Sequence, residues 1–190
     1  MRKIILIVHT SIDGFVAGKR GEFDDFNPSP ENLDFICSLT DEADAALMGR
    51  VSYQMLESFW PDARNKPDAS KSEIKYSNWY NDAQKIVISN SMIEKDLHNT
   101  KIINGNIADK ILQLKKQEGK SILMFGGPTT FQLLNELNLI DEFWVIVYPV
   151  MFGQGIPFSP SAMSLKRLKV LTTKQLSNGE IAINYKSSSQ

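Results

Sequence analysis

The sequence has few of the residues from which redox, metal and disulfide sites are built. Cys37 is the only cysteine, so no disulfide can form within the chain, and a reducing compartment is the simpler expectation. A single cysteine also excludes the His/Cys/Cys zinc site of nucleoside deaminases. The two histidines, His9 and His98, lie far apart and the acidic residues show no metal-ligand spacing, so no metal site is predicted. We expect Cys37 to be a small buried side chain.

An excess of charge is missing as well, because 21 basic and 22 acidic residues leave a net charge of -1. This balance gives no reason to expect nucleic acid or a membrane as a partner. The longest apolar run, residues 143–152, contains Pro149 and is too short to cross a bilayer. The N-terminal apolar run ends at Val8, so it predicts a first strand instead of a signal peptide. The cytoplasm is therefore the expected compartment.

Several motifs of nucleotide-binding and hydrolytic enzymes are also absent. No G-x-G-x-x-G follows the first apolar run, and no G-x-x-x-x-G-K-[ST], G-x-S-x-G or H-E-x-x-H occurs anywhere. The fingerprints of Rossmann proteins, P-loop proteins, serine hydrolases and zinc proteases are therefore missing.

What the chain does contain is a series of short apolar runs separated by helical spacing. With 190 residues, 42% of them hydrophobic, it can bury one core, and we predict a single domain over residues 1–186 with a flexible tail at 187–190. The expected strands are residues 3–8, 45–48, 85–89, 121–125 and 143–147. Continuous runs of this kind are typical of strands that are covered on both faces.

Helical spacing follows most of these runs. The expected helices begin after Pro30, after Gly49, at Asn106, and at Thr129 or Thr130. The polar segment 62–78 is expected to be a surface excursion. Strands that alternate with helices indicate an α/β protein with parallel strand pairs.

The C-terminal segment alternates instead. Residues 171–176 and 180–185 flank Ser177-Asn178-Gly179, and Asn-Gly predicts a type I′ hairpin turn with positive φ at both residues. The predicted fold is therefore a mixed, mostly parallel sheet flanked by helices and closed by a C-terminal antiparallel hairpin.

Small, hydroxyl and glycine residues follow four of the expected strands, at residues 10–14, 49–53, 89–91 and 126–130. In an open α/β sheet, ligands bind beyond the carboxyl ends of the strands, where helix N-termini point free N–H groups. Two of the four segments open helices, which favours an anion such as a phosphate. Each segment also has a plainer interpretation. Gly126-Gly127 could be a packing turn, Arg50 an exposed loop arginine and Asp13 an ordinary turn residue.

Five segments stand in the order and at the spacing of a known family. They are Thr-Ser-Ile-Asp-Gly-Phe-Val-Ala at 10–17, Ala-Ala-Leu-Met-Gly-Arg-Val-Ser-Tyr at 45–53, Lys-Ile-Val-Ile-Ser at 85–89, Leu-Met-Phe-Gly-Gly at 123–127 and Tyr-Pro-Val-Met-Phe-Gly-Gln-Gly-Ile-Pro-Phe at 148–158. Together they resemble the dihydrofolate reductase-like fold, and more specifically the reductase half of bacterial riboflavin-biosynthesis deaminase–reductases. The resemblance covers nearly the whole chain. It implies an NAD(P)H-dependent reductase, similar to 5-amino-6-(5-phosphoribosylamino)uracil reductase, that transfers a hydride to a pyrimidine- or pterin-like substrate.

The resemblance also implies which residues hold NADPH. Gly126 and Gly127, typically joined in this fold by a cis peptide, would hold the pyrophosphate at the start of the next helix. The other implied cofactor-binding residues are Thr10, Gly14, Val16, Ala17, Gly49, Arg50, Ser52, Ser89, Asn90, Thr129 and Thr130. Many relatives have a basic residue where this chain has Asn90, so NADH is an alternative cofactor. Asp13 is the implied catalytic residue, as the polar group beside the reacting ring.

On the substrate side, the resemblance points to Asn32, Tyr148, Phe152 and Gly153. Dihydrofolate reductases proper carry a carboxylate two residues after a proline at the start of the first helix, and counting from Pro30 this chain has Asn32 there. A true dihydrofolate reductase is therefore disfavoured, and a nucleotide-binding module without catalysis is the other alternative. Because relatives commonly form dimers, the resemblance implies a homodimer with a subunit contact at the 148–158 loop.

Overall fold

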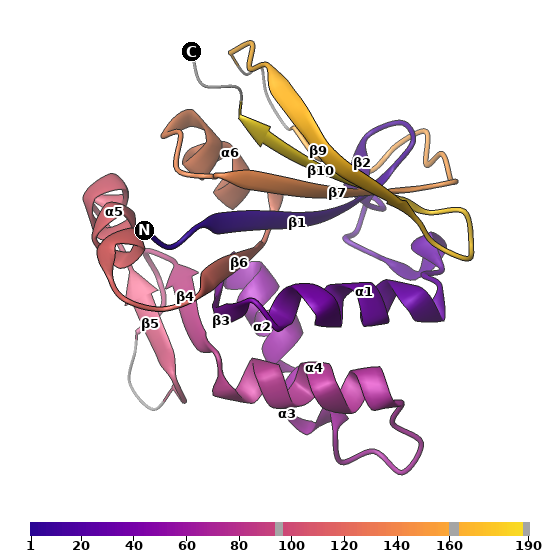
Figure 1. The fold of residues 1–190 in the computed structure, drawn as a ribbon, viewed down its shortest axis with the longest axis horizontal. Helices are drawn as coiled ribbons and strands as arrows, with labels where there is room; N and C mark the ends of the chain where they lie inside the picture. Colours follow the sequence, from indigo (N-terminus) through magenta and orange to yellow (C-terminus); the bar gives the residue numbers. More distant parts are fainter. Residues whose placement is uncertain (94–96, 160–163, 188–190) are drawn as a thin grey trace.

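A single large sheet organises the chain, with helices on both of its faces (Figure 1). The computed structural model describes residues 1–93, 97–159 and 164–187. Within these residues the sheet has eight strands, which are, in spatial order, β5 (Thr100–Ile103), β4 (Gln84–Ile88), β3 (Ala43–Gly49), β6 (Ser121–Phe125), β1 (Ile4–Ser11), β7 (Glu142–Tyr148), β10 (Ile181–Ser187) and β9 (Leu168–Gln175). The first six are parallel and the last two pair antiparallel, as predicted.

The helices pack on the sheet because the strands are apolar on both faces. They are α1 (Pro30–Thr40), α2 (Arg50–Glu57), α3 (Trp60–Ala63), α4 (Lys71–Asp82), α5 (Ile107–Lys116) and α6 (Pro128–Glu136), with a 3-10 turn at Asp24–Phe26. Along β1, Ile4 and Leu6 pack with α5 and α6, whereas Ile7 packs with α1 and α4. A second, small sheet pairs β2 (Phe15–Ala17) with β8 (Ile156–Pro157). No helix of the described residues has the length and apolar character needed to cross a membrane.

Helix α4 was not predicted, and its buried residues correct the interpretation of residues 62–78 as a surface excursion. Its start is held by Ser70 and Glu73, since the Ser70 hydroxyl accepts the Glu73 N–H at 3.2 Å and the Glu73 carboxylate accepts the Ser70 N–H at 2.8 Å. This reciprocal capping box defines the start of α4. The surrounding lysines and serines made the segment resemble a polar loop in the sequence. Tyr76 and Tyr80 then point inward and are buried.

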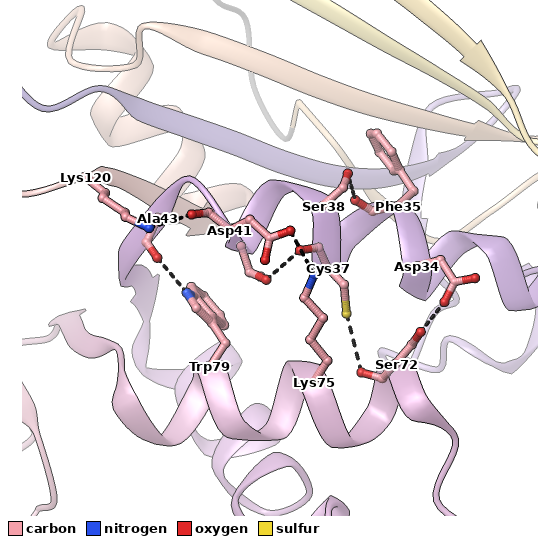
Figure 2. A network of polar contacts seen from close by, with 11 residues as sticks. Asp34, Phe35, Cys37, Ser38, Asp41, Ala43, Ser72, Lys75, Trp79 and Lys120 are labelled. Atoms are coloured by element: carbon pink, nitrogen blue, oxygen red, sulfur yellow. Dashed lines mark hydrogen bonds and ion pairs between the residues drawn. The ribbon is translucent and has the colours of Figure 1, made fainter.

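A network of polar contacts joins α1 to α4 (Figure 2). The Lys75 ammonium lies 2.8 Å from the Asp41 carboxylate, and the Cys37 thiol donates to the Ser72 carbonyl oxygen at 3.4 Å. The Trp79 indole N–H donates to the backbone at the start of β3, at 2.8 Å. Cys37 is buried, as expected, and burial raises the pKa of its thiol.

The C-terminal hairpin forms where predicted, but its turn is of a different type. Among the turn residues 177–179, only Gly179 has a positive φ, of 85°. A type I′ turn needs positive φ at two successive residues, so this turn is not type I′. The Gly179 N–H donates to the Leu176 carbonyl oxygen at 3.1 Å and the Leu176 N–H donates to the Glu180 carbonyl oxygen at 2.9 Å. A three-residue loop with one left-handed glycine therefore closes the hairpin. Ser187, predicted to belong to a flexible tail, instead pairs with Leu168 in the sheet, and the rest of the predicted tail, residues 188–190, lies outside the described part.

Two helix starts also differ from their predictions. Helix α6 begins at Pro128 with Gly127 as its N-cap, not at Thr129 or Thr130, because a proline fits the first helical position without losing a hydrogen bond. Asn106 does precede α5, but it has a left-handed backbone and its side chain makes no cap.

Candidate cofactor and substrate site

The predicted strand-end residues meet along one edge of the sheet. Strands β3, β6, β1 and β7 are neighbours and run parallel, so their carboxyl ends lie side by side. These ends bring Gly49, Gly126, Thr10 and Tyr148 to a common edge, where an open α/β sheet binds its ligands.

At this edge, the starts of α2 and α6 face each other. Their N-caps are Gly49 and Gly127, both extended, and in the described structure no side chain caps either helix. A Cβ at Gly49 would clash with the Thr130 hydroxyl, and a Cβ at Gly127 would lie 3.5 Å from Ser52 Oγ. Because the first N–H groups of a helix have no partner within it, two sets of free donors converge beside glycines.

The bond between Gly126 and Gly127 corrects one expectation. The described residues contain no cis peptide, so this bond is trans, the form favoured by about 3 kcal/mol outside proline. The two glycines also differ in the space around them. A Cβ at Gly126 would lie 3.1 Å from Leu6 Cδ1, closer than an ordinary contact, whereas Gly127 has room for one. Gly126 therefore meets a packing demand, and Gly127 leaves open space at the helix start.

The other predicted cofactor residues differ in their hydrogen bonds and in their exposure to solvent. Arg50 is exposed and donates to Gln54 Oε1 at 3.1 Å. Ser89 is buried, and its hydroxyl accepts the backbone N–H groups of Ser91 and Met92, so it closes a turn. In the described part, Ser89 and Asn90 make no hydrogen bond to the other predicted cofactor residues. Val16, Ala17, Thr10 and Thr130 are buried, whereas Gly14, Asn90 and Thr129 are exposed.

Asp13, the predicted catalytic residue, ties the end of β1 to the loop after β7. Its carboxylate accepts the Ser11 hydroxyl at 2.6 Å, the Gly153 N–H at 2.7 Å and the Phe152 N–H at 3.1 Å. The Ser11 hydrogen bond and then the two backbone N–H groups lower the pKa of Asp13. An acid held in this way stays ionised near neutral pH and positions the 152–153 segment.

On the substrate side, the structure adds His9, whose role the sequence did not reveal. The Asn32 amide donates to Tyr148 Oη at 2.9 Å, and His9 Nδ1 lies 2.7 Å from the same oxygen. The partner of His9 lies 139 residues away in the chain. Desolvation of the ring lowers the pKa of His9 to about 4, so the imidazole is neutral near neutral pH. The ring of Phe26 covers Tyr148 at 4.8 Å and Phe152 at 5.0 Å between centroids.

Glu180 lies fully buried on the same side of the sheet. One carboxylate oxygen accepts the Ser29 N–H at 2.7 Å, immediately before α1. The other carboxylate oxygen and the Ser29 hydroxyl are buried without a hydrogen-bond partner among the described residues. A glutamate beside a hairpin turn gives no sequence signal of burial, because that position is usually solvated.

The arrangement agrees with comparisons to known proteins. A family model described as the RibD C-terminal domain matches residues 2–182. The chain belongs to this family. The curated protein YyaP of Bacillus subtilis (strain 168), described as uncharacterized, is 32% identical over 186 residues, covering 97% of this chain and 94% of YyaP.

Solved structures of RibD-like reductases share the fold. A putative riboflavin biosynthesis protein from Shewanella sp. PV-4 has a TM-score of 0.76 at 24% identity and covers 98% of this chain and 99% of its own. The Thermotoga maritima deaminase/reductase of riboflavin biosynthesis has a TM-score of 0.69 at 15% identity, covering 98% of this chain and 57% of its own. Enterococcus faecalis dihydrofolate reductase, complexed with NADP(H), has a TM-score of 0.65 at 13% identity, covering 98% of this chain and 97% of its own. The RibD C-terminal domain here thus has the dihydrofolate reductase-like fold.

Proposed function

We propose that the protein is an NADPH-dependent reductase, with NADH as the alternative cofactor, that transfers a hydride to a pyrimidine- or pterin-like substrate. The observation that carries the proposal is the pair of uncapped helix starts at Gly49 and Gly127. A diphosphate placed there would accept hydrogen bonds from free backbone N–H groups and lie at the positive ends of two helix dipoles. Membership in the RibD C-terminal domain family supports a nicotinamide cofactor at this edge.

The proposed roles follow the position of each residue. Gly126, Gly127, Thr129 and Thr130 of the α6 start and Gly49, Arg50 and Ser52 of the α2 start would hold the phosphates. Ser89 and Asn90 would lie toward the adenosine end, and Thr10, Gly14, Val16 and Ala17 would line the nicotinamide. When bound, the reduced nicotinamide supplies the hydride.

The protein's own contribution would be to position the substrate and keep the site dry. Asn32, Tyr148, Phe152 and Gly153 would form the substrate side, with Asp13 holding the loop that carries Phe152 and Gly153. A neutral amide at position 32, already donating to Tyr148, supports a substrate other than dihydrofolate.

The proposal includes a cytoplasmic homodimer. Met151, in the 148–158 loop, is 70% exposed, and the edge strand β9 exposes Leu168, Val170 and Leu171 along its length. An exposed apolar edge strand favours pairing with another chain. Light scattering after gel filtration should give twice the mass of the chain, and a monomeric mass at every concentration would contradict this part of the proposal.

Titration of NADPH and NADH against tryptophan fluorescence tests the cofactor, with Trp60, Trp79 and Trp144 as reporters. We expect saturable binding of NADPH and consumption of NADPH at 340 nm when a pyrimidine or pterin acceptor is added. Binding without turnover on any acceptor would support a non-catalytic nucleotide-binding module. Absence of binding by either nucleotide would overturn the proposal.

A further inference from the structure

A polar cluster beneath α1 lies apart from the helix starts proposed to hold phosphate. It consists of His9 on β1, Asn32 on α1, Tyr148 on β7 and Glu180 immediately before β10. The registers of β1 and β10 with β7 put His9, Tyr148 and Glu180 on one face of the sheet, because side chains alternate along a strand. This is the face covered by α1, which explains how Asn32 reaches Tyr148.

The hydrogen bonds of this cluster fix the direction of each donor. An amide nitrogen can only donate, so Tyr148 Oη accepts from Asn32 Nδ2. Among the described residues, the only acceptor within reach of the phenol hydrogen is His9 Nδ1, at 2.7 Å. Tyr148 therefore donates to Nδ1, and the neutral imidazole carries its hydrogen on Nε2.

The groups around the His9 ring favour the neutral imidazole and the protonated phenol of Tyr148. Burial, and then the negative charge of Glu180, raises the pKa of Tyr148, so the phenol keeps its hydrogen. Desolvation lowers the pKa of His9, and the opposing effect of Glu180 is smaller. Glu180 also accepts the Ser29 N–H, which fixes the start of α1 and with it Asn32.

We propose that His9 is a specificity-determining residue that presents a neutral Nε2–H to the substrate and selects a heterocycle with a lone pair at that position. His9 is partly exposed, whereas its strand neighbours Val8 and Thr10 are buried. The inference rests on the reductase proposed above. A carbonyl oxygen or an unprotonated ring nitrogen satisfies this donor. A 2,4-diaminopyrimidine protonated on N1 carries amino N–H donors at the two ring positions where a uracil carries carbonyl oxygens, and it meets the Asn32 amide where a carboxylate would be needed.

A purely structural role for His9 is the rival interpretation. Its ring stacks on Tyr148 with centroids 5.5 Å apart, and packing alone would account for that contact. The two interpretations differ in what a substitution does to ligand choice. His9→Gln keeps an N–H donor near the position of Nε2, whereas His9→Leu fills space without one.

The first experiment measures the tautomer directly by ¹⁵N nuclear magnetic resonance of histidine-labelled protein, without any ligand. The variant His98→Gln removes the only other histidine and assigns the signals. We expect the Nε2–H tautomer of His9 at neutral pH and a mixture of tautomers in Tyr148→Phe. An Nδ1–H tautomer or an imidazolium at neutral pH overturns the proposal.

The second experiment compares two ring probes, 5,6-diaminouracil and 2,4-diaminopyrimidine, on the NADPH-loaded protein by calorimetry. We expect the uracil to bind at least about tenfold more tightly, the equivalent of one buried hydrogen bond. His9→Leu should remove most of that ratio and His9→Gln should retain it. Equal or reversed preference, binding of neither probe, or an unchanged ratio in His9→Leu contradicts the proposal.

Failure of this inference can be told apart from failure of the reductase. NADPH binding by the unmodified protein is followed by tryptophan fluorescence in the same samples. Loss of NADPH binding overturns the proposed function, whereas normal NADPH binding with the wrong tautomer or probe ratio overturns only the role of His9.

Discussion

Two kinds of helix start occur in this chain, and they differ in how the free N–H groups are used. At α4, Ser70 and Glu73 satisfy each other's backbone N–H groups with their own side chains. At α2 and α6, the N-caps are glycines, and no side chain makes a capping hydrogen bond among the described residues. The capped start belongs to α4, which packs on α1, while the bare starts directly follow β3 and β6 at the carboxyl edge of the sheet. The donors left unsatisfied at α2 and α6 are the basis of the phosphate site proposed above.

The start of α1 is an intermediate case. Its N-cap residue, Ser29, makes no side-chain cap, and its N–H is accepted by Glu180 from a different part of the chain. The carboxylate of Glu180 therefore already lies beside this start, which disfavours a second anion there. Among the helices of the described residues, only α2 and α6 combine a glycine N-cap, no side-chain cap and a position at the carboxyl edge.

The largest expected effect comes from Gly49→Val. A branched side chain would clash with the Thr130 hydroxyl and occupy the space between the two bare helix starts. We expect NADPH to bind at least about tenfold more weakly, which corresponds to about 1.4 kcal/mol. Valine is also a poor N-cap, so the free energy of unfolding should fall by about 1 kcal/mol. Fluorescence titration measures the affinity and urea denaturation measures the stability.

Ser70→Ala is the matched control at the capped start. Loss of the N-cap oxygen leaves the Glu73 N–H without its acceptor and should lower the free energy of unfolding by about 1 kcal/mol. NADPH affinity should stay within about twofold, because no ligand is proposed to contact α4. Since both variants lose similar stability, weaker NADPH binding in Ser70→Ala would show that general destabilisation, not the helix start, controls the affinity.

A smaller effect is expected from Lys75→Met in the network between α1 and α4. The Lys75–Asp41 pair is about half exposed on both sides, and exposed ion pairs contribute about 0.5 kcal/mol. The substitution should lower the free energy of unfolding by that amount in low salt and by less in high salt. Urea denaturation at two ionic strengths measures the difference, and a loss above about 2 kcal/mol would contradict a surface role.

The strands of the sheet centre could be predicted because each is a continuous apolar run, as in β1 and β6. Strand β5 was missed because Thr100–Ile103 is short and half polar. Helix α4 was missed because its two inward tyrosines stand among lysines and serines, although Ser70 and Glu73 have the spacing of a capping box. Long apolar runs and clear helical spacing therefore predict strands and helices, whereas short or largely polar elements are not recognised from the sequence.

The proposed phosphate side and the proposed substrate side of the candidate site differ in how far they could be predicted from local sequence. Gly49 and Gly127 were predicted because a glycine between a strand and a helix is a local signal. His9 and Glu180 were not predicted, since the hydrogen bond of His9 spans 139 residues and that of Glu180 spans 151. Only the register of β7 with β1 and β10 brings those residues together, and no short segment encodes it.

The smallest effect concerns pH and again separates the capped start from the bare ones. Hydrogen bonds from the Ser70 N–H and then the Ser70 hydroxyl lower the pKa of Glu73. Since the pKa in the folded state is below that of the unfolded chain, this contact stabilises the fold above the unfolded pKa and is lost as pH falls through the folded pKa. Glu73→Gln should remove that part of the acid dependence of the unfolding free energy.

Gln54→Ala, on the bare helix α2, should leave the acid dependence unchanged, because Gln54 does not titrate. Identical acid dependence in Glu73→Gln and the unmodified protein would mean that the carboxylate contributes no cap at α4.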